Sequence, residues 1–565
     1  MRVQRLFTNK RLIRRGAPPR VRYPFVSFFI FEQSCDYYFQ KTQNKKLKIK
    51  NSKHKTQKRI KFTNKKSKEV RMQISKLLKD EPVDSKNLEC YRERGYTNED
   101  LLPKPQEKRT MSALNFCTLW MQSVHNIPNY AAVGAFLLMG YSPIYVMIGI
   151  MLGAILTAIV MVANGVVGSK YGIPFSMHLR ATYGKAGAQL PGFLRGVVAA
   201  ICWYGIQTYI GAKALEILVG KICPEFLTLG SKIPFVGSHI PIIISFAIFW
   251  LLNLAIGLGG GKTLNKLTVV LSPLIYVVFG CMSVWAISCA GGLSAIMQYH
   301  ATVQAPTNCG LGLFMMMVVN SVLGVWAAPA VSIADFTQNA KSTMAQLKGQ
   351  IASFLLSYAL FAFTSVVILV GGSLFYHETI TDVLVIINKW DSLPGIAIAT
   401  GLLLLTTVCT NATGNIVPAA YQLTALAPRF VNYKRGVVIA ALVSTVLMPW
   451  KFMANITGFL NLIGMLLGPI AGVLLADYYV VKRTHIDLDQ IYYDTNSSSK
   501  SAYSGTNWIS YTATILGLLF ALSGQIIPLL SPLTQISWIV GCAVGFVCQI
   551  LLSKVFQPTM AKERK

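Results

Sequence analysis

The chain has 565 residues, of which 53% are hydrophobic and only 13% are charged, and its mean hydropathy is +0.48. A soluble globular chain of this length is rarely so apolar. The formal charge of +31 does not indicate a nucleic-acid-binding protein, because +19 of it lies in residues 1–71, which hold 22 Lys and Arg against three acids. The other apolar residues fall in blocks of about 18 to 25, the length that a helix needs to cross a bilayer. Composition therefore predicts an all-α integral membrane protein.

The basic N-terminal part separates from the apolar blocks. We predict that residues 1–110 form a largely disordered cytosolic extension, residues 111–555 a membrane domain of about twelve helices, and residues 556–565 a cytosolic tail. Contact of the extension with anionic lipid or RNA is an alternative interpretation. The internal Met72 also allows that the working protein begins there and that residues 1–71 are dispensable. No signal peptide is predicted.

Twelve candidate spans follow in chain order: 112–139, 144–167, 196–218, 240–258, 267–290, 311–333, 351–374, 395–420, 436–449, 456–480, 509–527 and 536–552. Basic residues cluster after spans two, four, six, eight and ten, with Lys213, Lys221 and Lys232 as exceptions. The clusters are Lys170, Arg180, Lys185 and Arg195, then Lys262 and Lys266, Lys341 and Lys348, Arg429, Lys434 and Arg435, and finally Lys482 and Arg483. The positive-inside rule places these loops and both termini in the cytosol.

Two spans are interrupted at corresponding positions. The first carries His-Asn-Ile-Pro-Asn (125–129) at its middle, and the sixth carries Gly-Val-Trp (324–326) followed by Pro329. Proline removes a backbone donor and clashes with the preceding turn, so each span is predicted to break into two half-helices. Free backbone groups at membrane depth need a cavity or a ligand. Two inverted halves with a site at the breaks are typical of secondary transporters. The alternative is that the prolines only kink packed helices.

Polar side chains mark the third and eighth spans. The third reads ICWYGIQTYIG, which places Trp203 and Gln207 on one helix face. A flat ring and an amide suit a planar heterocycle with C=O and N–H groups, although such a pair also packs helices together. The eighth span carries Thr406, Cys409, Thr410, Asn411 and Asn415 within ten residues. Amides at membrane depth are costly unless paired, so we predict that Gln207 and Asn415 face one polar cavity.

Enzyme signatures are lacking in the sequence, and no enzymatic activity is predicted. GLGGGKTLNK approaches a phosphate loop but follows a membrane helix, and we interpret it as a cytosolic turn. There is no GxSxG or HExxH motif and no pair of intramembrane carboxylates. The eleven cysteines contain no CxxC pair, which argues against a zinc or disulfide framework.

With these residues in hand, the chain resembles the nucleobase:cation symporter family, and within it the bacterial-type allantoin permeases. The resemblance runs from about residue 98 to residue 555. It is carried by NEDLLPKPQEKRT, LWMQSVHNIPNYAAVGA, SKYGIPF, GIQTYIGAKALEIL, GVWAAPAVSIADFTQ, NIVPAAY, MLLGPIAGVLLADYY and ISWIVG. It implies two inverted five-helix repeats plus two C-terminal helices, with helices one and six discontinuous.

The resemblance also implies a substrate site. In related hydantoin transporters the ligand ring lies between two tryptophans, which by motif position match Trp203 and Trp326. The implied amides are Gln207, Asn415 and Asn126, and some relatives carry glutamine at the last of these. The full implied set is Trp203, Gln207, Trp326, Asn415, Asn126 and Gly324.

A cation site is implied where spans one and eight meet. It would use the backbone carbonyls of Gln122 and His125 and groups at Thr406, Cys409 and Thr410. Hydantoin transporters have hydroxyls at the last two positions, and a thiol is a poor ligand for a hard cation. Coupling to Na⁺ or to H⁺ therefore stays open, with His125 as the ionisable side chain beside the break.

The sequence thus predicts a plasma-membrane symporter that imports a small planar ureide or nucleobase-like molecule by alternating access, with allantoin as the first candidate. Uracil, cytosine, hydantoin or a vitamin are alternatives within the family. A passive channel or facilitator, or a sensor that binds without transport, are alternatives from other classes. The expected partners are a small heterocycle and the lipid bilayer, with no cofactor beyond the coupling cation, no nucleic acid and no obligate protein partner.

Overall fold

The computed structural model describes residues 78–230, 232–233, 238–301, 309–448, 451, 456–493 and 501–556. All of them lie within one compact unit, Lys76–Lys565. Within these ranges the regular elements are helices, and β pairing is confined to two isolated bridges. The predictions for residues 1–77 and 557–565 lie outside the described part of the chain.

Nine helical stretches of the described residues are long and apolar enough to cross a membrane. They are α6 (Pro143–Tyr171), α8 to α9 (Gln189–Ile222), two stretches of α10 (Ile240–Gly259 and Lys266–Cys289), α15 (Thr343–Tyr376), α17 to α18 (Leu393–Leu426), the end of α20 with η6 (Leu462–Val481), α22 (Trp508–Ile526) and α24 (Ser537–Phe556). The other three predicted spans are the ninth, α19 (Tyr433–Val446), and the two broken ones. The prediction of an all-helical multi-pass membrane protein is confirmed.

Both predicted breaks are present. Span one consists of α4 (Ala113–Val124) and α5 (Ile127–Leu137), and span six of α12 (Leu311–Val325) and α13 (Ala327–Val331). Pro128 occupies the first turn of α5, where its missing N–H is tolerated. Trp326 lies between α12 and α13.

The predicted turn between spans four and five is wrong. The backbone of GLGGGKTLNK is helical, and α10 (Ile240–Cys289) runs through it for 50 residues. Each glycine costs a helix only about 1 kcal/mol, so glycines alone need not end a helix. Residues 260–265 separate the two apolar stretches of α10, Ile240–Gly259 and Lys266–Cys289, which correspond to the predicted spans four and five.

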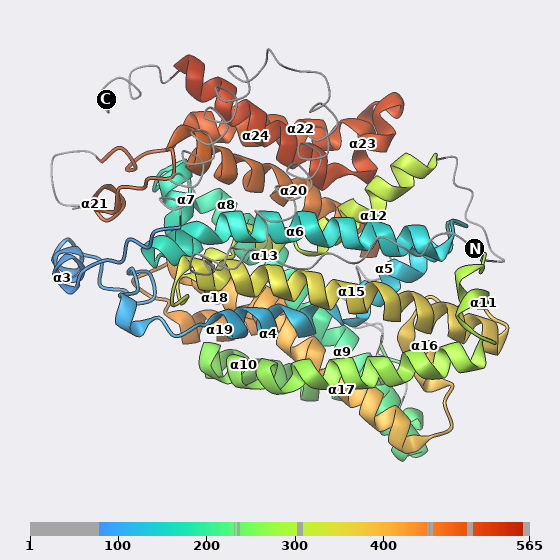
Figure 1. The fold of residues 1–565 in the computed structure, drawn as a ribbon. Coiled ribbons are helices and arrows are strands. Elements are labelled where there is room, and N and C mark those ends of the chain that lie inside the picture. Colours follow the sequence, from blue (N-terminus) through green and yellow to red (C-terminus); the bar gives the residue numbers. More distant parts are fainter. Residues whose placement is uncertain are drawn as a thin grey trace, which may run out of the picture. The chain divides into compact units, whose positions relative to one another are not determined.

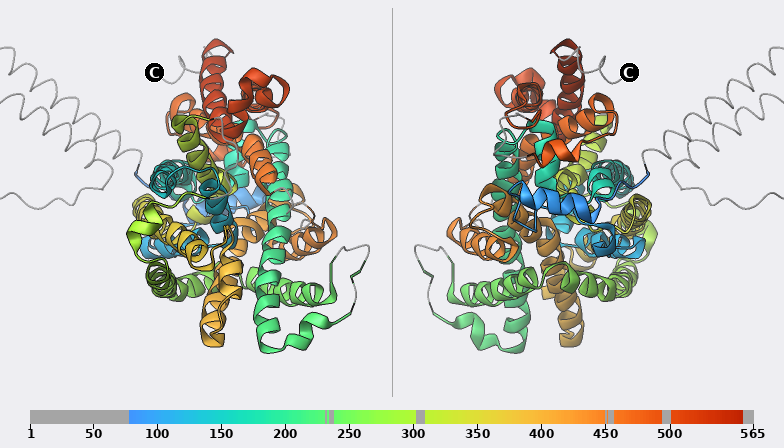
Figure 2. Two further views of the ribbon diagram at one scale, coloured as in Figure 1. Left: turned by 90° about the vertical axis from the view of Figure 1, so that its right-hand side faces the viewer. Right: turned by 90° about the vertical axis from the view of Figure 1, so that its left-hand side faces the viewer.

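The helices form two packed groups (Figure 1). In the first, α15 packs against α4, α6 and α10, while α9 packs against α10 and α17. In the second, α20, α22 and α24 pack together, and α20 also contacts α12 and α13. Figures 1 and 2 show these C-terminal helices, coloured red, gathered at one edge of the bundle. The broken sixth span therefore lies between the two groups.

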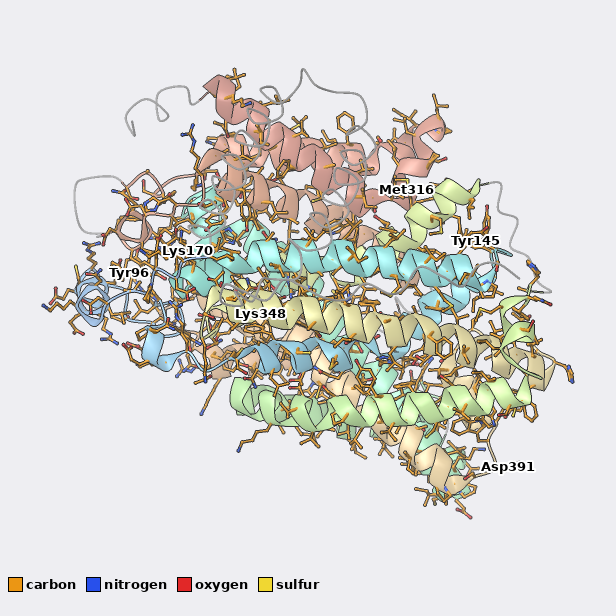
Figure 3. All side chains as sticks on the ribbon, viewed as in Figure 1. Tyr96, Tyr145, Lys170, Met316, Lys348 and Asp391 are labelled. Carbon is orange, nitrogen blue, oxygen red and sulfur yellow. The ribbon has the colours of Figure 1, made fainter. Side chains whose placement is uncertain are left out.

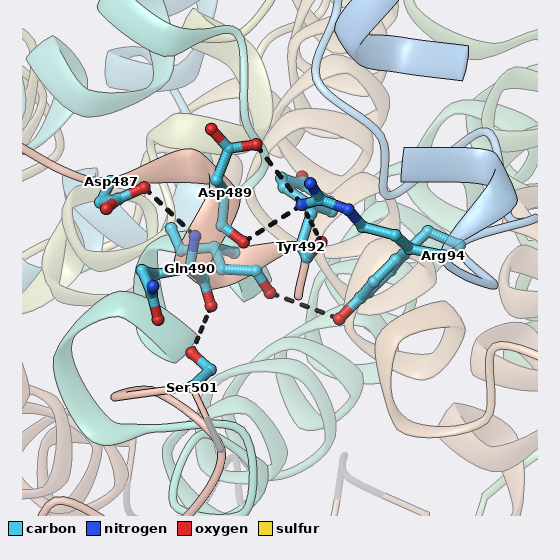
Figure 4. Close-up of polar contacts among 8 residues, drawn as sticks. Arg94, Asp487, Asp489, Gln490, Tyr492 and Ser501 are labelled. Atoms are coloured by element: carbon cyan, nitrogen blue, oxygen red, sulfur yellow. Dashed lines mark hydrogen bonds and ion pairs between the residues drawn. The ribbon is translucent and has the colours of Figure 1, made fainter. Parts of the chain in front are cut away.

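Residues 78–111, called the N-terminal strap below, pack against the ends of the helices. We expected an irregular extension up to residue 110, but the strap contains α3 (Ser85–Glu93), and Tyr91 stacks on Tyr492 with ring centroids 4.8 Å apart. Figure 4 shows Arg94 reaching towards Asp489 and Tyr492. The strap buries a small apolar set that the surrounding charges hide in the composition: Val83, Leu88, Tyr91, Leu101 and Leu102.

The strap contacts the loops that follow spans two, six, eight and ten. Glu81 pairs with Lys170 at 3.1 Å, the Met111 N–H donates to the Asn339 carbonyl at 2.8 Å, and the Asn98 amide donates to the Pro428 carbonyl at 3.0 Å. In Figure 3, Lys170 and Lys348 lie towards the end of the bundle that carries Tyr96 of the strap, and Tyr145 and Asp391 lie at the opposite end. The basic loops thus gather at one end of the helices.

Candidate functional site

The break in span one is closed by two of its own amides. The side-chain nitrogen of Asn126 donates to the Ser123 carbonyl at 2.5 Å, and that of Asn129 donates to the Val124 carbonyl at 2.8 Å. The Asn126 side-chain oxygen accepts from the Asn129 N–H at 3.1 Å, which caps α5. Carbonyls freed by the break are therefore satisfied inside the protein. Both ends of the Asn126 amide are engaged in this conformation, and its role as a substrate contact stays a prediction.

His125 lies beside the break in an aromatic cage. Its ring centroid is 4.7 Å from that of Phe279 and 5.5 Å from that of Phe361, and Nδ1 lies 3.2 Å from the Tyr130 hydroxyl. The ring is fully buried, and Nε2 has no hydrogen-bond partner among the described residues. The cage fixes the imidazole and leaves one nitrogen unsatisfied.

The break in span six places a tryptophan next to open space. The indole N–H of Trp326 donates to the Tyr358 hydroxyl at 2.5 Å, and its ring meets Trp120 and Phe354 edge-on. Gly324, two residues earlier, is buried, yet a Cβ added there would meet no atom within 4 Å. Gly324, one of the predicted substrate residues, therefore borders unfilled volume.

Trp203 and Gln207 lie on α9 and are both buried, and Trp203 belongs to the same hydrophobic core as Trp326. The side-chain oxygen of Gln207 is buried without a hydrogen-bond partner among the described residues. A buried carbonyl in that state costs about 1–3 kcal/mol. The predicted substrate residues thus include an acceptor that the protein itself leaves unsatisfied.

Asn415 lies on the π-helix η4 (Ala412–Ile416) and begins a chain of buried amides. It donates to Asn411 at 2.9 Å, and Asn411 donates in turn to Asn253 of α10 at 3.0 Å. The sequence analysis did not single out Asn253. It could have been noticed as a single amide in the apolar fourth span, because such polar residues are rare at membrane depth. The chain connects the predicted substrate residue to two neighbouring helices.

Spans one and eight, where the resemblance implies a cation site, are in contact. Helix α4 packs against α17, and the Ser123 hydroxyl lies 3.3 Å from that of Thr413 in η4. The hydroxyls of Thr406 and Thr410 donate to carbonyls one turn earlier, and Cys409 between them is buried. Their oxygens keep lone pairs, and hard neutral oxygens of this kind suit an alkali-metal ion. Gln122 is adjacent to Ser123 in the sequence, and its side-chain oxygen is buried without a hydrogen-bond partner among the described residues.

Arg195, which we placed in the loop after span two, lies instead inside the helix of span three. It is fully buried in the π-helix η2 (Leu194–Ala199). Its guanidinium donates to the Ala328 carbonyl at 2.6 Å, the Ser332 hydroxyl at 3.0 Å and the Gly414 carbonyl at 2.9 Å. One side chain thus joins spans three, six and eight, all of which bear predicted site residues.

Two ionisable groups close to the basic end of the bundle were also missed. Asp335, on α14 (Ala334–Thr337), is fully buried, and its carboxyl accepts from the Phe175 N–H at 2.9 Å. Burial raises the pKa of Asp335 to about 7, against the opposing effects of that hydrogen bond and of Arg195. Burial likewise lowers the pKa of Lys104 in the strap to about 8.

A hollow lies between α5, α6, α12 and α15. It is lined by side chains that include Asn129, Phe136, Val322, Tyr358 and Phe361. Tyr358 is the hydrogen-bond partner of Trp326, so the hollow borders the aromatic cluster at the span-six break. Trp203, Gln207 and Asn415 do not line it.

Two broken helices beside buried, unsatisfied amides in an all-helical membrane protein are typical of a transport protein of the permease class. The model of the family described as "Permease for cytosine/purines, uracil, thiamine, allantoin" matches residues 103–541. The chain belongs to this family.

Two relatives support the assignment. The chain is 47% identical to the "Putative allantoin permease" of Escherichia coli (strain K12) over 468 residues, which are 82% of this chain and 96% of that one. It is 36% identical to the "Allantoin permease" of Bacillus subtilis (strain 168) over 469 residues, with 82% and 94% covered.

The fold matches that of Mhp1, a nucleobase-cation-symport-1 family transporter solved in a closed conformation with bromovinylhydantoin bound. The TM-score is 0.66 at 22% identity, over 82% of this chain and 97% of that one. The expected architecture, two inverted five-helix repeats and two additional helices, is confirmed by this fold.

Proposed function

We propose that this chain is a cation-coupled symporter that imports a small planar ureide, with allantoin as its substrate. The proposal is supported by the two similar relatives that carry the name of allantoin permease. The observation in the structure that carries it is the buried side-chain oxygen of Gln207, which no described residue satisfies. A ureide N–H would satisfy this oxygen, and the open volume at Gly324 would accommodate part of the ligand.

The proposed mechanism is alternating access. Substrate enters from outside and binds between Trp203 and Trp326 beside the two breaks, and the half-helices close over it. The coupling cation binds between α4 and α17, at the junction that the Ser123–Thr413 contact continues. Because this junction joins the first half of the fold to the second, a bound cation would favour one relative arrangement of the halves over the other.

Sodium is our first candidate for the cation, because the oxygens of Thr406 and Thr410 are hard ligands. A proton carried by His125 is the rival, and its unsatisfied Nε2 is the observation that favours it. We further propose that the protein lies in the plasma membrane with both termini in the cytosol, because the loops rich in Lys and Arg gather at the end that carries the strap.

Uptake of labelled allantoin by cells that express the protein tests the proposal. We expect Trp203→Ala and Asn415→Ala to abolish uptake while membrane insertion stays normal. Trp508→Ala is the matched control, because that side chain is 72% exposed and far in sequence from the site. Unchanged uptake in both site variants would remove the site assignment.

A further inference from the structure

Four side chains from three membrane spans, Asn415 among them, form one hydrogen-bonded chain. Asn253 comes from α10, Thr208 from α9, and Asn411 and Asn415 from α17 and η4. Asn253, Thr208 and Asn411 are fully buried. An amide has a donor end and an acceptor end, so each link in such a chain constrains the orientation of the next.

The orientation of the chain is set by two backbone carbonyls, which can only accept hydrogen bonds. The Asn253 nitrogen donates to the Phe249 carbonyl at 2.8 Å, so the Asn253 oxygen must face Asn411. The Thr208 hydroxyl donates to the Tyr204 carbonyl at 2.7 Å, so towards Asn411 this hydroxyl can only accept.

Asn411 therefore meets acceptors alone on one side. Its nitrogen lies 3.0 Å from the Asn253 oxygen, 3.2 Å from the Tyr204 carbonyl and 3.3 Å from the Thr208 hydroxyl. These acceptors require the donor end of the Asn411 amide. The Asn411 oxygen is left for Asn415, whose nitrogen donates to it at 2.9 Å.

We infer that Asn253 is a positioning residue for substrate selection: through Asn411 it turns Asn415 so that the carbonyl oxygen, and not the amide nitrogen, faces the substrate. The inference deepens the proposed function and rests on Asn415 contacting the transported ureide. Together with the unsatisfied oxygen of Gln207, it gives the site two amide acceptors. Such a site selects a ligand by its N–H groups, because an analogue that lacks an N–H leaves a buried acceptor unpaired.

The test measures discrimination between N–H and N-methyl compounds. Proteoliposomes that contain the full-length protein take up labelled allantoin in competition with allantoin derivatives that carry a methyl group on each nitrogen in turn. The variants are Asn253→Leu, which removes the acceptor, and Asn253→Asp, whose carboxylic acid can supply both an O–H donor and a C=O acceptor in the same shape. Asn320→Leu is the matched control, because Asn320 is buried but bonds to Gln535 and Ile539 outside the chain of amides.

We expect the wild-type protein to prefer allantoin about tenfold or more over the derivative methylated on at least one of its ring or ureide nitrogens. Asn253→Leu should reduce that preference about fivefold, the change expected for one neutral hydrogen bond. Asn253→Asp and Asn320→Leu should retain it. The steric effect of the methyl group is common to all four proteins and does not change the comparison.

The inference would be overturned if Asn253→Leu preferred allantoin over its N-methyl derivative as strongly as the wild type does. It would also be overturned if Asn320→Leu lost as much of this preference as Asn253→Leu, because the loss would then be a general effect of removing a buried amide. Absence of allantoin uptake by the wild-type protein would instead refute the proposed substrate, so the two failures are distinguishable.

Discussion

Gly324 allows the substrate cavity to be probed without disturbing the fold. Its added Cβ meets nothing within 4 Å, and alanine favours a helix over glycine by up to about 1 kcal/mol. Gly324→Ala should therefore insert and melt like the wild-type protein. If the substrate fills this volume, the extra methyl should cost about 1–3 kcal/mol of binding, the range observed for overpacked interiors. That corresponds to a rise of roughly fivefold to a hundredfold in KM for allantoin uptake, and Gly324→Val should raise KM further.

The assay is concentration-dependent uptake together with the Tm of the detergent-solubilised protein. Gly401→Ala is the matched control, because its Cβ also meets nothing within 4 Å but Gly401 lies one turn from the exposed Ile398 and Leu405 on α17. The control should change neither KM nor Tm. An unchanged KM in both Gly324 variants would show that substrate does not occupy this volume, and a large loss of Tm in Gly324→Ala would show that the volume is not open.

Three further predictions concern the strap, the buried charges and the cation. A chain that begins at Met72 should take up substrate like the full chain. Deletion through residue 110 should lower the Tm, because it removes five buried apolar side chains, each of which contributes at most about 1.5–3 kcal/mol to the free energy of unfolding. Equal Tm values for the two truncated chains would contradict the packing of the strap. The raised pKa of Asp335, about 7 in the fold against about 4 when unfolded, means that stability falls as the pH rises through about 4 to 7, so the Tm of Asp335→Asn should gain on that of the wild type from pH 5 to pH 8, and parallel pH profiles would refute this. Cys409→Ser should lower the sodium concentration for half-maximal uptake, since a hydroxyl is the better ligand, and a sodium titration that is flat in both proteins would argue for the proton.

Much of the fold could be predicted from hydropathy and proline. Apolar blocks long enough to span a bilayer are visible without any knowledge of tertiary contacts, and Pro128 breaks its helix for a local steric reason. The matching breaks in spans one and six indicated two inverted halves, and the resemblance implied the same architecture. The turn predicted at GLGGGKTLNK was wrong because glycine lowers helix stability by only about 1 kcal/mol, and the backbone between the two apolar stretches of α10 stays helical.

The site was only partly predictable, because burial and orientation depend on other helices. Arg195 was assigned to a loop by its charge, and the carbonyls of Ala328 and Gly414 that hold it are more than 130 residues away. Asn253 carries no motif, and its importance arises from contact with Asn411. The apolar face of the strap was hidden because Lys, Arg and Glu surround Tyr91 and Leu88 in sequence.

The most direct test of symport is accumulation of labelled allantoin in proteoliposomes, with a sodium gradient and a pH gradient imposed separately. We predict that an inward sodium gradient drives the internal concentration above the external one, and that a sodium ionophore abolishes the excess. Accumulation driven by the pH gradient alone would assign the coupling to the proton. Equilibration without accumulation under either gradient would contradict symport and leave a passive facilitator.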